Sequence, residues 1–332
     1  MKQENAFKRF LKMQESGVIL VTIAFVIFVT IINSSFITGS NLVNVFRSSG
    51  FTLITGLGMT MVFIAGGLDI SVGSTLAVGG TVSAMAAKAG APVFVAVLLG
   101  LLVGFIIGIF NGLIVVYLKI SPIIVTLGTQ YIGRGIVYIL TKGVAVYPLP
   151  KTFQALEQTY IFNIPMIVII AVILSVIAHI AMTKTTFGRS LYAVGGNVEA
   201  ARISGIKTQA TSMAAYVITA VCAAFTGVMM SARLGSGQAS TGEGFEMTVI
   251  ACVIIGGTSA NGGSGTVLGT VIGALFMNIL ENSMTLMKIS VYWQKVVIGL
   301  ILIGAVILDQ YRKERSIRAD LKNLEKAGKE GA

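Results

Sequence analysis

Charged residues are scarce in this sequence. Only 11% of its 332 residues are Asp, Glu, Lys or Arg, and 55% are hydrophobic, whereas about a quarter of an ordinary soluble domain is charged. Apolar runs of about 18 residues or more recur along the chain, and runs of that length are typical of transmembrane helices. The composition therefore excludes an ordinary soluble protein and predicts an all-α polytopic membrane protein.

Histidine, cysteine and nucleotide-binding motifs are also sparse. His179 is the only histidine, and Cys222 and Cys252 are the only cysteines; both cysteines lie in apolar runs, at a spacing that fits no metal motif. The chain contains no P-loop, because G-x-x-x-x-G-K followed by Ser or Thr does not occur. We therefore expect no catalytic residue, no metal and no cofactor in this chain, and any ATP must be bound by another subunit.

The net charge of +11 is not distributed like a nucleic-acid-binding surface. Most Lys and Arg residues lie in the two tails and in one internal loop, as is typical of the cytoplasmic segments of membrane proteins. The pattern predicts cytoplasmic tails at 1–16 and 309–332, a transmembrane domain at 17–308, and a cytoplasmic loop at 184–209. It favours membrane lipid, and no nucleic acid, as a partner.

About ten membrane spans are predicted from hydropathy. Two of them are predicted to contain a broken or re-entrant helix. The eighth is shorter than the roughly 20 residues that a span needs, and the fourth contains Asn111-Gly112. Membranes permit such breaks only against protein or a water-filled cavity. The predicted spans are 17–33, 48–66, 70–87, 91–118, 121–141, 163–183, 210–231, 247–260, 265–284 and 290–308.

Glycines recur every four residues in the fourth span, at Gly100, Gly104, Gly108 and Gly112. Residues at this spacing share one helix face, and small residues there let a neighbouring backbone approach closely. The pattern favours tight helix packing over a flexible pathway.

Several polar side chains fall within or beside the apolar segments, where they need a partner or water. Asp69, or Ser71 beside it, could cap the third span; alternatively, Asp69 could belong to the path of a solute. Asn278, Glu281 and Asn282 share one face of the ninth span, which must meet other helices or a polar cavity. The candidate residues for a solute path are Asp69, Asn111, Gln130, Asn278, Glu281 and Asn282.

The loop after the seventh span, residues 232–246, is predicted to lie outside the membrane. It carries Arg233, Glu243 and Glu246 among several glycines. These charges could receive an extracytoplasmic partner, or they could form ion pairs in a solvated turn.

A polar segment at residues 184–207 separates two long apolar runs and must lie outside the hydrocarbon. Within it, Asn197 can cap a short helix that begins at Val198, and Gly205 can end that helix. Glu199 and Arg202 are three residues apart and therefore share a face. Such a loop is a candidate docking surface for a soluble partner.

Four ordered stretches carry a resemblance to a known family: GLDISVGS at 67–74, SPIIVTLG at 121–128, residues 188–206 beginning GRSLYAVGGN, and residues 254–270 beginning IIGGTS. Together they resemble the inner-membrane permease subunit of bacterial simple-sugar ABC importers of the ribose type, within the branched-chain amino acid/ribose permease superfamily. The stretches occur in order from the second to the ninth span, so the resemblance covers nearly the whole chain.

The resemblance implies the ABC importer permease fold, a location in the bacterial inner membrane, and several protein partners. A second permease copy or a paralogous permease would complete the core, a cytoplasmic ABC ATPase subunit would bind ATP-Mg, and an extracytoplasmic sugar-binding protein would deliver a monosaccharide such as ribose. The implied ATPase-coupling residues are Arg189, Asn197, Glu199, Ala200, Ala201, Arg202, Ser204 and Gly205.

Other cargoes and other classes of protein remain open at this point. Members of the same superfamily could import nucleosides, branched-chain amino acids or a furanosyl signal molecule. An ion-coupled secondary carrier is a rival, although such carriers more often show several buried carboxylates or histidines. A membrane scaffold without transport activity is a third possibility.

Overall fold

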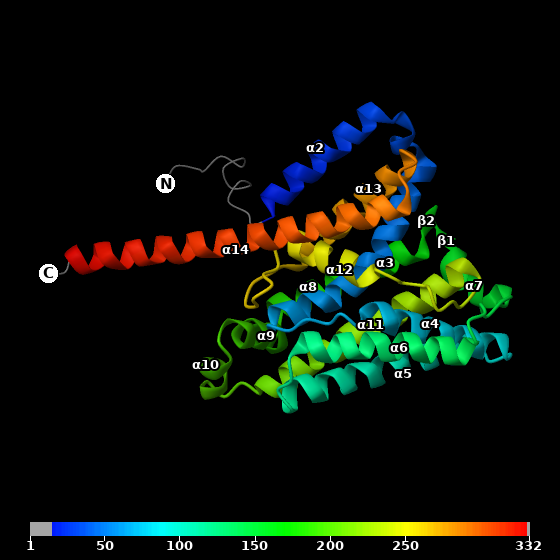
Figure 1. Ribbon diagram of the computed structural model, residues 1–332, viewed down its shortest axis with the longest axis horizontal. Coiled ribbons are helices and arrows are strands. Elements are labelled where there is room, and N and C mark those ends of the chain that lie inside the picture. Colours follow the sequence, from blue (N-terminus) through cyan, green and yellow to red (C-terminus); the bar gives the residue numbers. More distant parts are fainter. Residues whose placement is uncertain (1–14, 331–332) are drawn as a thin grey trace.

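The computed structural model describes residues 15–330, except for the side chains of residues 312–313 and 315–330. The predicted tail at 1–16 therefore lies almost entirely outside the described residues. The chain is helical apart from one short hairpin, as Figure 1 shows. The elements are α2 (Ser16–Ile32), η1 (Ser34–Ile37), α3 (Gly39–Ile64), α4 (Val72–Lys88), α5 (Val93–Gly112), η2 (Leu113–Tyr117), α6 (Pro122–Thr141), α7 (Lys151–Gln158), β1 (Tyr160–Ile161), β2 (Ile164–Pro165), α8 (Met166–Lys184), α9 (Thr186–Gly196), α10 (Val198–Ile203), α11 (Thr208–Leu234), α12 (Phe245–Ile255), α13 (Val267–Leu286) and α14 (Val291–Glu330).

A helix occupies each of the ten ranges that hydropathy predicted as spans. Six helices of the described chain are long and apolar enough to cross a membrane by length and composition. The protein is therefore a multi-pass membrane protein, whereas the count of ten spans stays a prediction. The tail predicted to begin at 309 continues α14 as a helix to Glu330.

The two predicted helix irregularities are both present. The α-helical geometry of α5 ends at Gly112, and the next five residues form the π-helical turn η2. The helix at the eighth predicted span is α12, which has only 11 residues. Such a helix is about 16 Å long, which is too short to cross a hydrocarbon core of about 30 Å.

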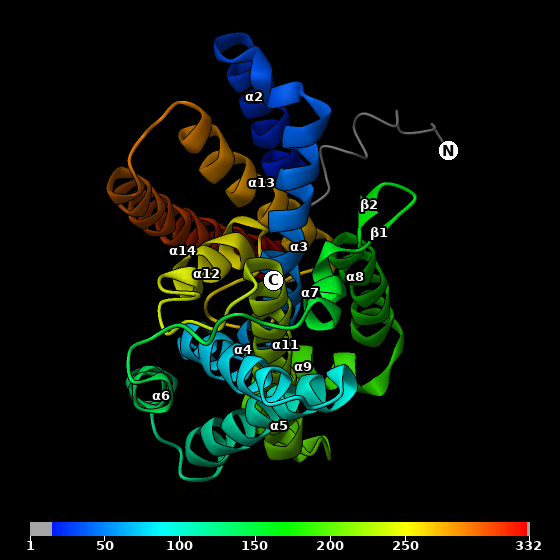
Figure 2. The same ribbon diagram turned by 90° about the vertical axis from the view of Figure 1, so that its right-hand side faces the viewer.

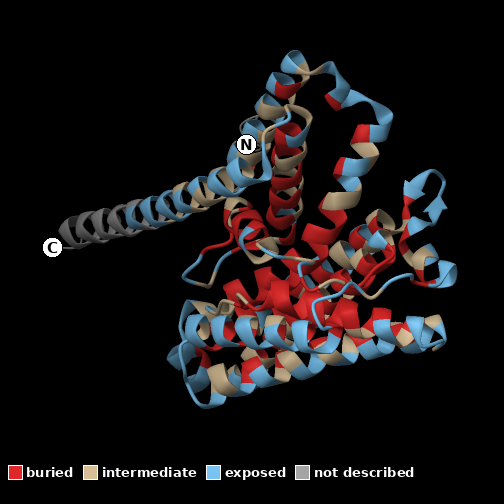
Figure 3. Ribbon diagram, turned by 45° about the vertical axis from the view of Figure 1, so that its right-hand side comes forward, coloured by how far each residue is buried: buried red, intermediate tan, exposed pale blue. Residues whose placement is uncertain are grey.

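The core is built around α11 and α3, which pack against most other long helices. Figure 3 shows the buried residues gathered in these central elements, while α5 and α6 expose most of their surface. The glycine row of α5 faces α11: a Cβ on Gly104 would meet Ala220 and Ala224, and one on Gly108 would meet Val217. The row therefore serves close helix packing, as predicted.

The two ends of the bundle differ in what they carry. Figure 1 places α9, α10 and the C-terminal end of α14 at one end, and α7 with the β1–β2 hairpin at the other. We call these the α10 end and the α7 end. The start of α2 also lies at the α10 end, because Thr266 Oγ1, just before α13, donates a hydrogen bond to Glu15 Oε1 (2.5 Å). That this end faces the cytoplasm remains a prediction from the distribution of charge.

Candidate functional site

The helix α10 is capped at both ends as the sequence predicted. Asn197 Oδ1 accepts a hydrogen bond from the Ala200 backbone N–H (3.0 Å), which satisfies a donor in the first turn. At the other end Gly205 has φ +82°, and the backbone N–H groups of Gly205 and Ile206 bond back into the helix (3.0 and 3.1 Å). This is a Schellman motif, which needs a residue that tolerates a left-handed backbone. A helix of only six residues is thereby given defined ends.

The surface of α10 is more apolar than the sequence pattern suggested. Ile203 is 82% exposed and Val198 is also exposed, although both lie in a polar segment. Glu199 and Arg202 form an ion pair (2.9 Å) with side chains 71% and 68% exposed, which contributes about 0–1 kcal/mol because water screens it. The exposed face therefore combines two apolar side chains with a charged pair.

Ala201 is not on that exposed face. Its side chain is only 4% exposed because α10 rests on the protein through it, whereas Ala200 is exposed. Of the two alanines that the resemblance implies for ATPase coupling, only Ala200 is therefore on the exposed face, and the coupling role of both stays a prediction. Arg189 on α9 is exposed near the same end, and Ser204 is exposed while its hydroxyl donates to the Ala200 carbonyl (2.9 Å).

A buried polar cluster connects the start of α4 with α5 and α6. Asp69 is fully buried, and its Oδ1 accepts from the Ser71 backbone N–H (2.9 Å) and hydroxyl (2.5 Å). Asn111 donates to the Ser71 hydroxyl (2.9 Å) and accepts from the Thr129 hydroxyl (2.6 Å). The structure thus brings Asp69 and Asn111 together through Ser71, although neither side chain faces open space.

The helix α4 is capped by a residue that the sequence did not suggest for this role. The Asp69 side chain accepts from the backbone N–H of Ser71, the N-cap residue of α4, but neither the Asp69 nor the Ser71 side chain accepts from an N–H within α4. The predicted capping is therefore confirmed only in part. Gln130 of α6 accepts from the Ser74 backbone N–H (2.8 Å) in the first turn of α4. The unpaired backbone N–H groups of a helix N-terminus can thus be satisfied by a side chain of another helix as well as by a local one.

The polar face of α13 contacts other helices. Asn278 donates to the Thr52 hydroxyl of α3 (3.0 Å), and Glu281 accepts from the Thr248 hydroxyl of α12 (3.0 Å). The Asn282 side chain exchanges two hydrogen bonds with that of Asn41 on α3 (2.9 and 2.8 Å). Of the two alternatives, the structure supports helix packing for this face, which lies apart from the Asp69 cluster. A role in a solute path stays a prediction.

The loop predicted to lie outside instead runs back along α4. Gly237, at the α7 end, pairs with Val146 and packs against Thr81 and Ala84. Gly242 packs against Gly73 and Leu76, so the segment descends by about 12 Å along the helix. Irregular backbone at such depth is tolerated only where protein or water covers it. We call residues 235–244 the re-entrant segment.

The three charged residues of that loop consequently lie in different places. Arg233 lies in the last turn of α11, and its guanidinium stacks over the Phe51 ring (5.5 Å). Glu246 lies in the first turn of α12, and its Oε2 is buried against Gly73, where no Cβ would fit. Glu243 is exposed and near Lys295 (3.9 Å). The prediction of one outward-facing surface is therefore wrong for Glu246.

Arg134 of α6 is the functional candidate that the sequence prediction missed. Its guanidinium donates to the carbonyls of Ala239 (2.5 Å) and Thr241 (2.7 Å) in the re-entrant segment, and to that of Gly73 in α4 (3.2 Å). The sequence could have indicated it, because a positively charged residue inside an apolar membrane span is by itself a functional candidate. Gln130 lies one helical turn away on the same face of α6.

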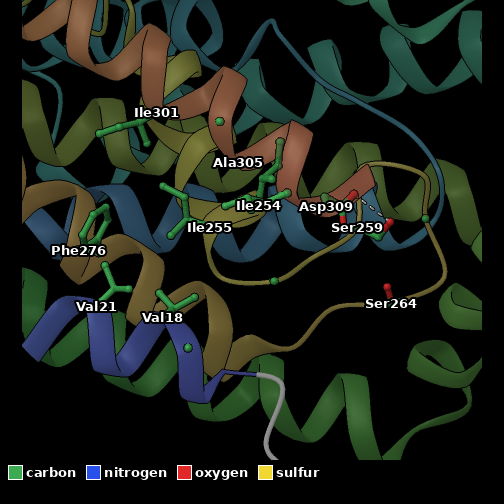
Figure 4. Close-up of a pocket in the computed structure, with 15 residues that line it drawn as sticks. Val18, Val21, Ile254, Ile255, Ser259, Ser264, Phe276, Ile301, Ala305 and Asp309 are labelled. Carbon is green, nitrogen blue, oxygen red and sulfur yellow. Dashed lines mark hydrogen bonds between the residues drawn. The ribbon is translucent and has the colours of Figure 1, made fainter. Parts of the chain in front are cut away.

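A cavity of about 730 Å³ lies elsewhere, between α2, α12 and α14 (Figure 4). Its walls are mainly apolar, and Asp309 accepts hydrogen bonds from the Ser259 hydroxyl (3.4 Å) and the Ala260 N–H (3.2 Å) at its margin. None of the predicted path residues lines it. The groove is therefore separate from the polar clusters described above.

Comparison with known proteins identifies the family. A family described as the branched-chain amino acid transport system permease component matches residues 41–306. The chain belongs to this permease family. Its relatives include the ribose import permease protein of Bacillus subtilis (38% identical; 90% of this chain and 93% of the relative), the D-allose transport system permease protein of Escherichia coli (36%; 88% and 90%) and the autoinducer 2 import system permease protein of Salmonella typhi (32%; 89% and 85%). No solved structure gives a significant match.

Proposed function

We propose that this protein is the permease subunit of an ATP-driven ABC importer that translocates a monosaccharide, with ribose as the first candidate. A cytoplasmic ATPase subunit binds and hydrolyses ATP-Mg, and an extracytoplasmic binding protein delivers the sugar. The relatives named for ribose and allose import support a sugar as cargo. A second permease copy or a paralogous permease completes the path.

The observation that carries this proposal is the isolated helix α10. It is capped at both ends and exposes Val198 and Ile203 at the end of the bundle where α14 also ends (Figure 1). A soluble subunit that covers these side chains would remove them from water, which favours docking. Helix α11 begins at Thr208, soon after α10, and runs through the core for 27 residues. Movement of α10 would therefore reach the α7 end directly.

The coupling proposal is tested by replacing residues of α10 in the complete complex. We expect the double variant Glu199→Ala with Gly205→Val to lose ribose uptake in cells and stimulation of ATPase activity, while the amount in the membrane stays unchanged. Valine at position 205 disfavours the left-handed backbone that ends α10. The variant Ile203→Glu should weaken docking by placing a carboxylate in an apolar contact.

The matched control is Gln209→Ala, which alters an exposed side chain at the start of α11 and leaves α10 intact. It should transport as the wild type does. Uptake at the wild-type rate in both α10 variants would refute the coupling role. Active uptake by the chain alone, abolished by an uncoupler while ATP is present, would instead indicate an ion-coupled carrier.

A second cargo deserves a direct comparison because one group of relatives is named for autoinducer 2 import. None of the contacts described above favours one of these solutes over another. Binding of ribose, allose and autoinducer 2 to the cognate binding protein, measured by calorimetry, would identify the cargo. Ribose is expected to bind most tightly.

A further inference from the structure

The re-entrant segment, residues 235–244, packs closely on α4 and α6, with Ala239 among buried apolar side chains, but it forms few backbone hydrogen bonds to other elements. Its backbone forms turns, and it is bounded by Gly235 and Gly244 with positive φ (64° and 81°). Apart from bonds to the ends of α11 and α12 that flank it, the backbone of the segment pairs with another part of the described chain at one place, between Gly237 and Val146 (2.8 and 3.1 Å). The deeper part, which contains Ala239 and Thr241, has no such ladder of hydrogen bonds among the described residues.

Arg134 supplies the attachment of that deeper part. One guanidinium nitrogen donates to two carbonyls of the segment, and the other donates to the Gly73 carbonyl of α4. Hydrogen bonds from a charged donor are stronger than neutral ones, and the planar guanidinium can serve two elements at once. The Arg134 side chain thus connects α6, α4 and the re-entrant segment through hydrogen bonds from a single guanidinium group.

The surroundings of Arg134 are acidic and closely packed. Glu246 and Glu243 are the carboxylates that influence it, and Glu246 lies against Gly73 in the first turn of α4, where an anion is favoured. A Cβ on Gly73 would collide with the Glu246 carboxylate and the Gly242 carbonyl, and one on Gly242 would press on Leu76. The closed arrangement therefore leaves no passage between the segment and α4.

The segment is also the direct continuation of the helix that leads from α10. Helix α11 ends at Leu234, and the segment starts at the next residue. We propose that the re-entrant segment is the gate of the solute path at the α7 end, and that Arg134 is the positioning residue that holds this gate closed. This inference rests on the proposed transport function, in which α10 moves with the ATPase and α11 carries the movement to the gate.

The gate is tested by passive leak of ribose from proteoliposomes that contain the purified complex without ATP or binding protein. Arg134→Gln should raise the leak at least about tenfold, because one hydrogen bond from a charged donor shifts a closed–open equilibrium by a decade or more. Arg134→Lys should leak less than Arg134→Gln, since an ammonium keeps the charge but cannot reach both elements equally. A variant that is merely misassembled would lose ATP-driven uptake without gaining leak.

The matched control is Lys295→Gln. Lys295 also contacts the segment, because it lies near Glu243, but this ion pair is exposed. The leak of this variant should equal that of the wild type. An Arg134→Gln complex that keeps wild-type uptake and shows no leak would overturn the gate while leaving the proposed function intact. Failure of the wild-type complex to take up ribose with ATP would count against the proposed function alone, because the leak assay uses no ATP.

A second measurement follows the segment itself. Ala239→Cys, placed in a Cys222→Ala and Cys252→Ala background, sits at a buried position of the segment. A membrane-impermeant thiol reagent should label it slowly in the wild-type context and much faster with Arg134→Gln. Ala232→Cys, fully buried in α11, should stay unlabelled in both. Equal labelling of Ala239→Cys in the two contexts would contradict the proposal.

Discussion

Asp69 is the residue whose surroundings constrain its chemistry most clearly. It is fully buried, its Oδ1 accepts twice from Ser71, and its Oδ2 has no hydrogen-bond partner among the described residues. Burying a charged group without a full set of partners is costly. The carboxyl group therefore positions Ser71, and through Ser71 it positions Asn111. The unpaired Oδ2 oxygen opposes this arrangement energetically.

The structural and transport roles of Asp69 can be separated by two substitutions. Asp69→Ala leaves the Ser71 N–H and hydroxyl without their acceptor and should destabilise the protein by about 1–3 kcal/mol. Asp69→Asn keeps an acceptor and buries no charge, so its stability should match or exceed that of the wild type. Thermal unfolding in lipid-detergent micelles measures both. Normal stability with lost uptake in Asp69→Asn would instead place this carboxylate in the solute path.

Single residues were predictable where the decisive contact is local. Asn197 and Gly205 could be assigned to the ends of α10 because a helix cap depends on residues within one turn. The burial of Ala201 and the capping of α4 by Gln130 could not, since both depend on which helix lies alongside. The spacing of residues along one helix does not specify the neighbour that it meets.

At the scale of elements, α3 and α13 are joined by a reciprocal pair of amides. Asn41 and Asn282 each donate one hydrogen bond to the other (2.9 and 2.8 Å), at a contact partly removed from water. Hydrogen bonds between membrane helices contribute less than the low dielectric suggests, because the unfolded chain in the membrane also finds partners. The pair therefore orients the two helices more than it stabilises them.

A double-mutant cycle measures that contribution. Replacing Asn41 and Asn282 by alanine, singly and together, should give a coupling energy of about 0.6 kcal/mol and at most about 1.7 kcal/mol. The reference cycle is Thr285 with Gln294, an exposed hydrogen-bonded pair (3.3 Å) for which the coupling should be close to zero. Equal coupling energies in the two cycles would contradict a specific role for the amide pair.

The re-entrant segment shows the limit of hydropathy at this scale. Its polar and glycine-rich sequence resembles an exposed loop, and the sequence located its ends nearly correctly. Its depth could not be predicted, because the groups that satisfy its backbone come from Arg134 on α6 and its packing comes from Gly73 and Leu76 on α4. Polar backbone is stable inside a membrane when other elements cover it.

Considered as a whole molecule, a single copy places charged groups on a face that lipid would contact. Glu243 and Lys295 are both largely exposed beside the re-entrant segment, and Tyr131 on α6 is 76% exposed near Arg134. Figure 2 places α6 and α8 on opposite sides of the molecule. The side chains that α8 exposes between Val172 and Ile180 are apolar apart from His179. Helix α6 also exposes mainly apolar side chains, so what distinguishes its side of the molecule is the charged pair Glu243 and Lys295 beside the re-entrant segment. Charged groups at membrane depth are expected to face protein or water.

The exposed charged pair beside the re-entrant segment predicts where a second permease subunit binds. Tyr131→Cys, in the Cys222→Ala and Cys252→Ala background, should cross-link two copies through a disulfide when membranes are oxidised. The matched position Ile173→Cys on α8 should not, because that face suits lipid. If the partner is a paralogous permease, the Tyr131→Cys product will contain that subunit and its mass will reveal it. Cross-linking through Ile173 with none through Tyr131 would contradict this prediction and place the subunit interface on the α8 face, with the Glu243–Lys295 pair left to be covered by water or by another partner.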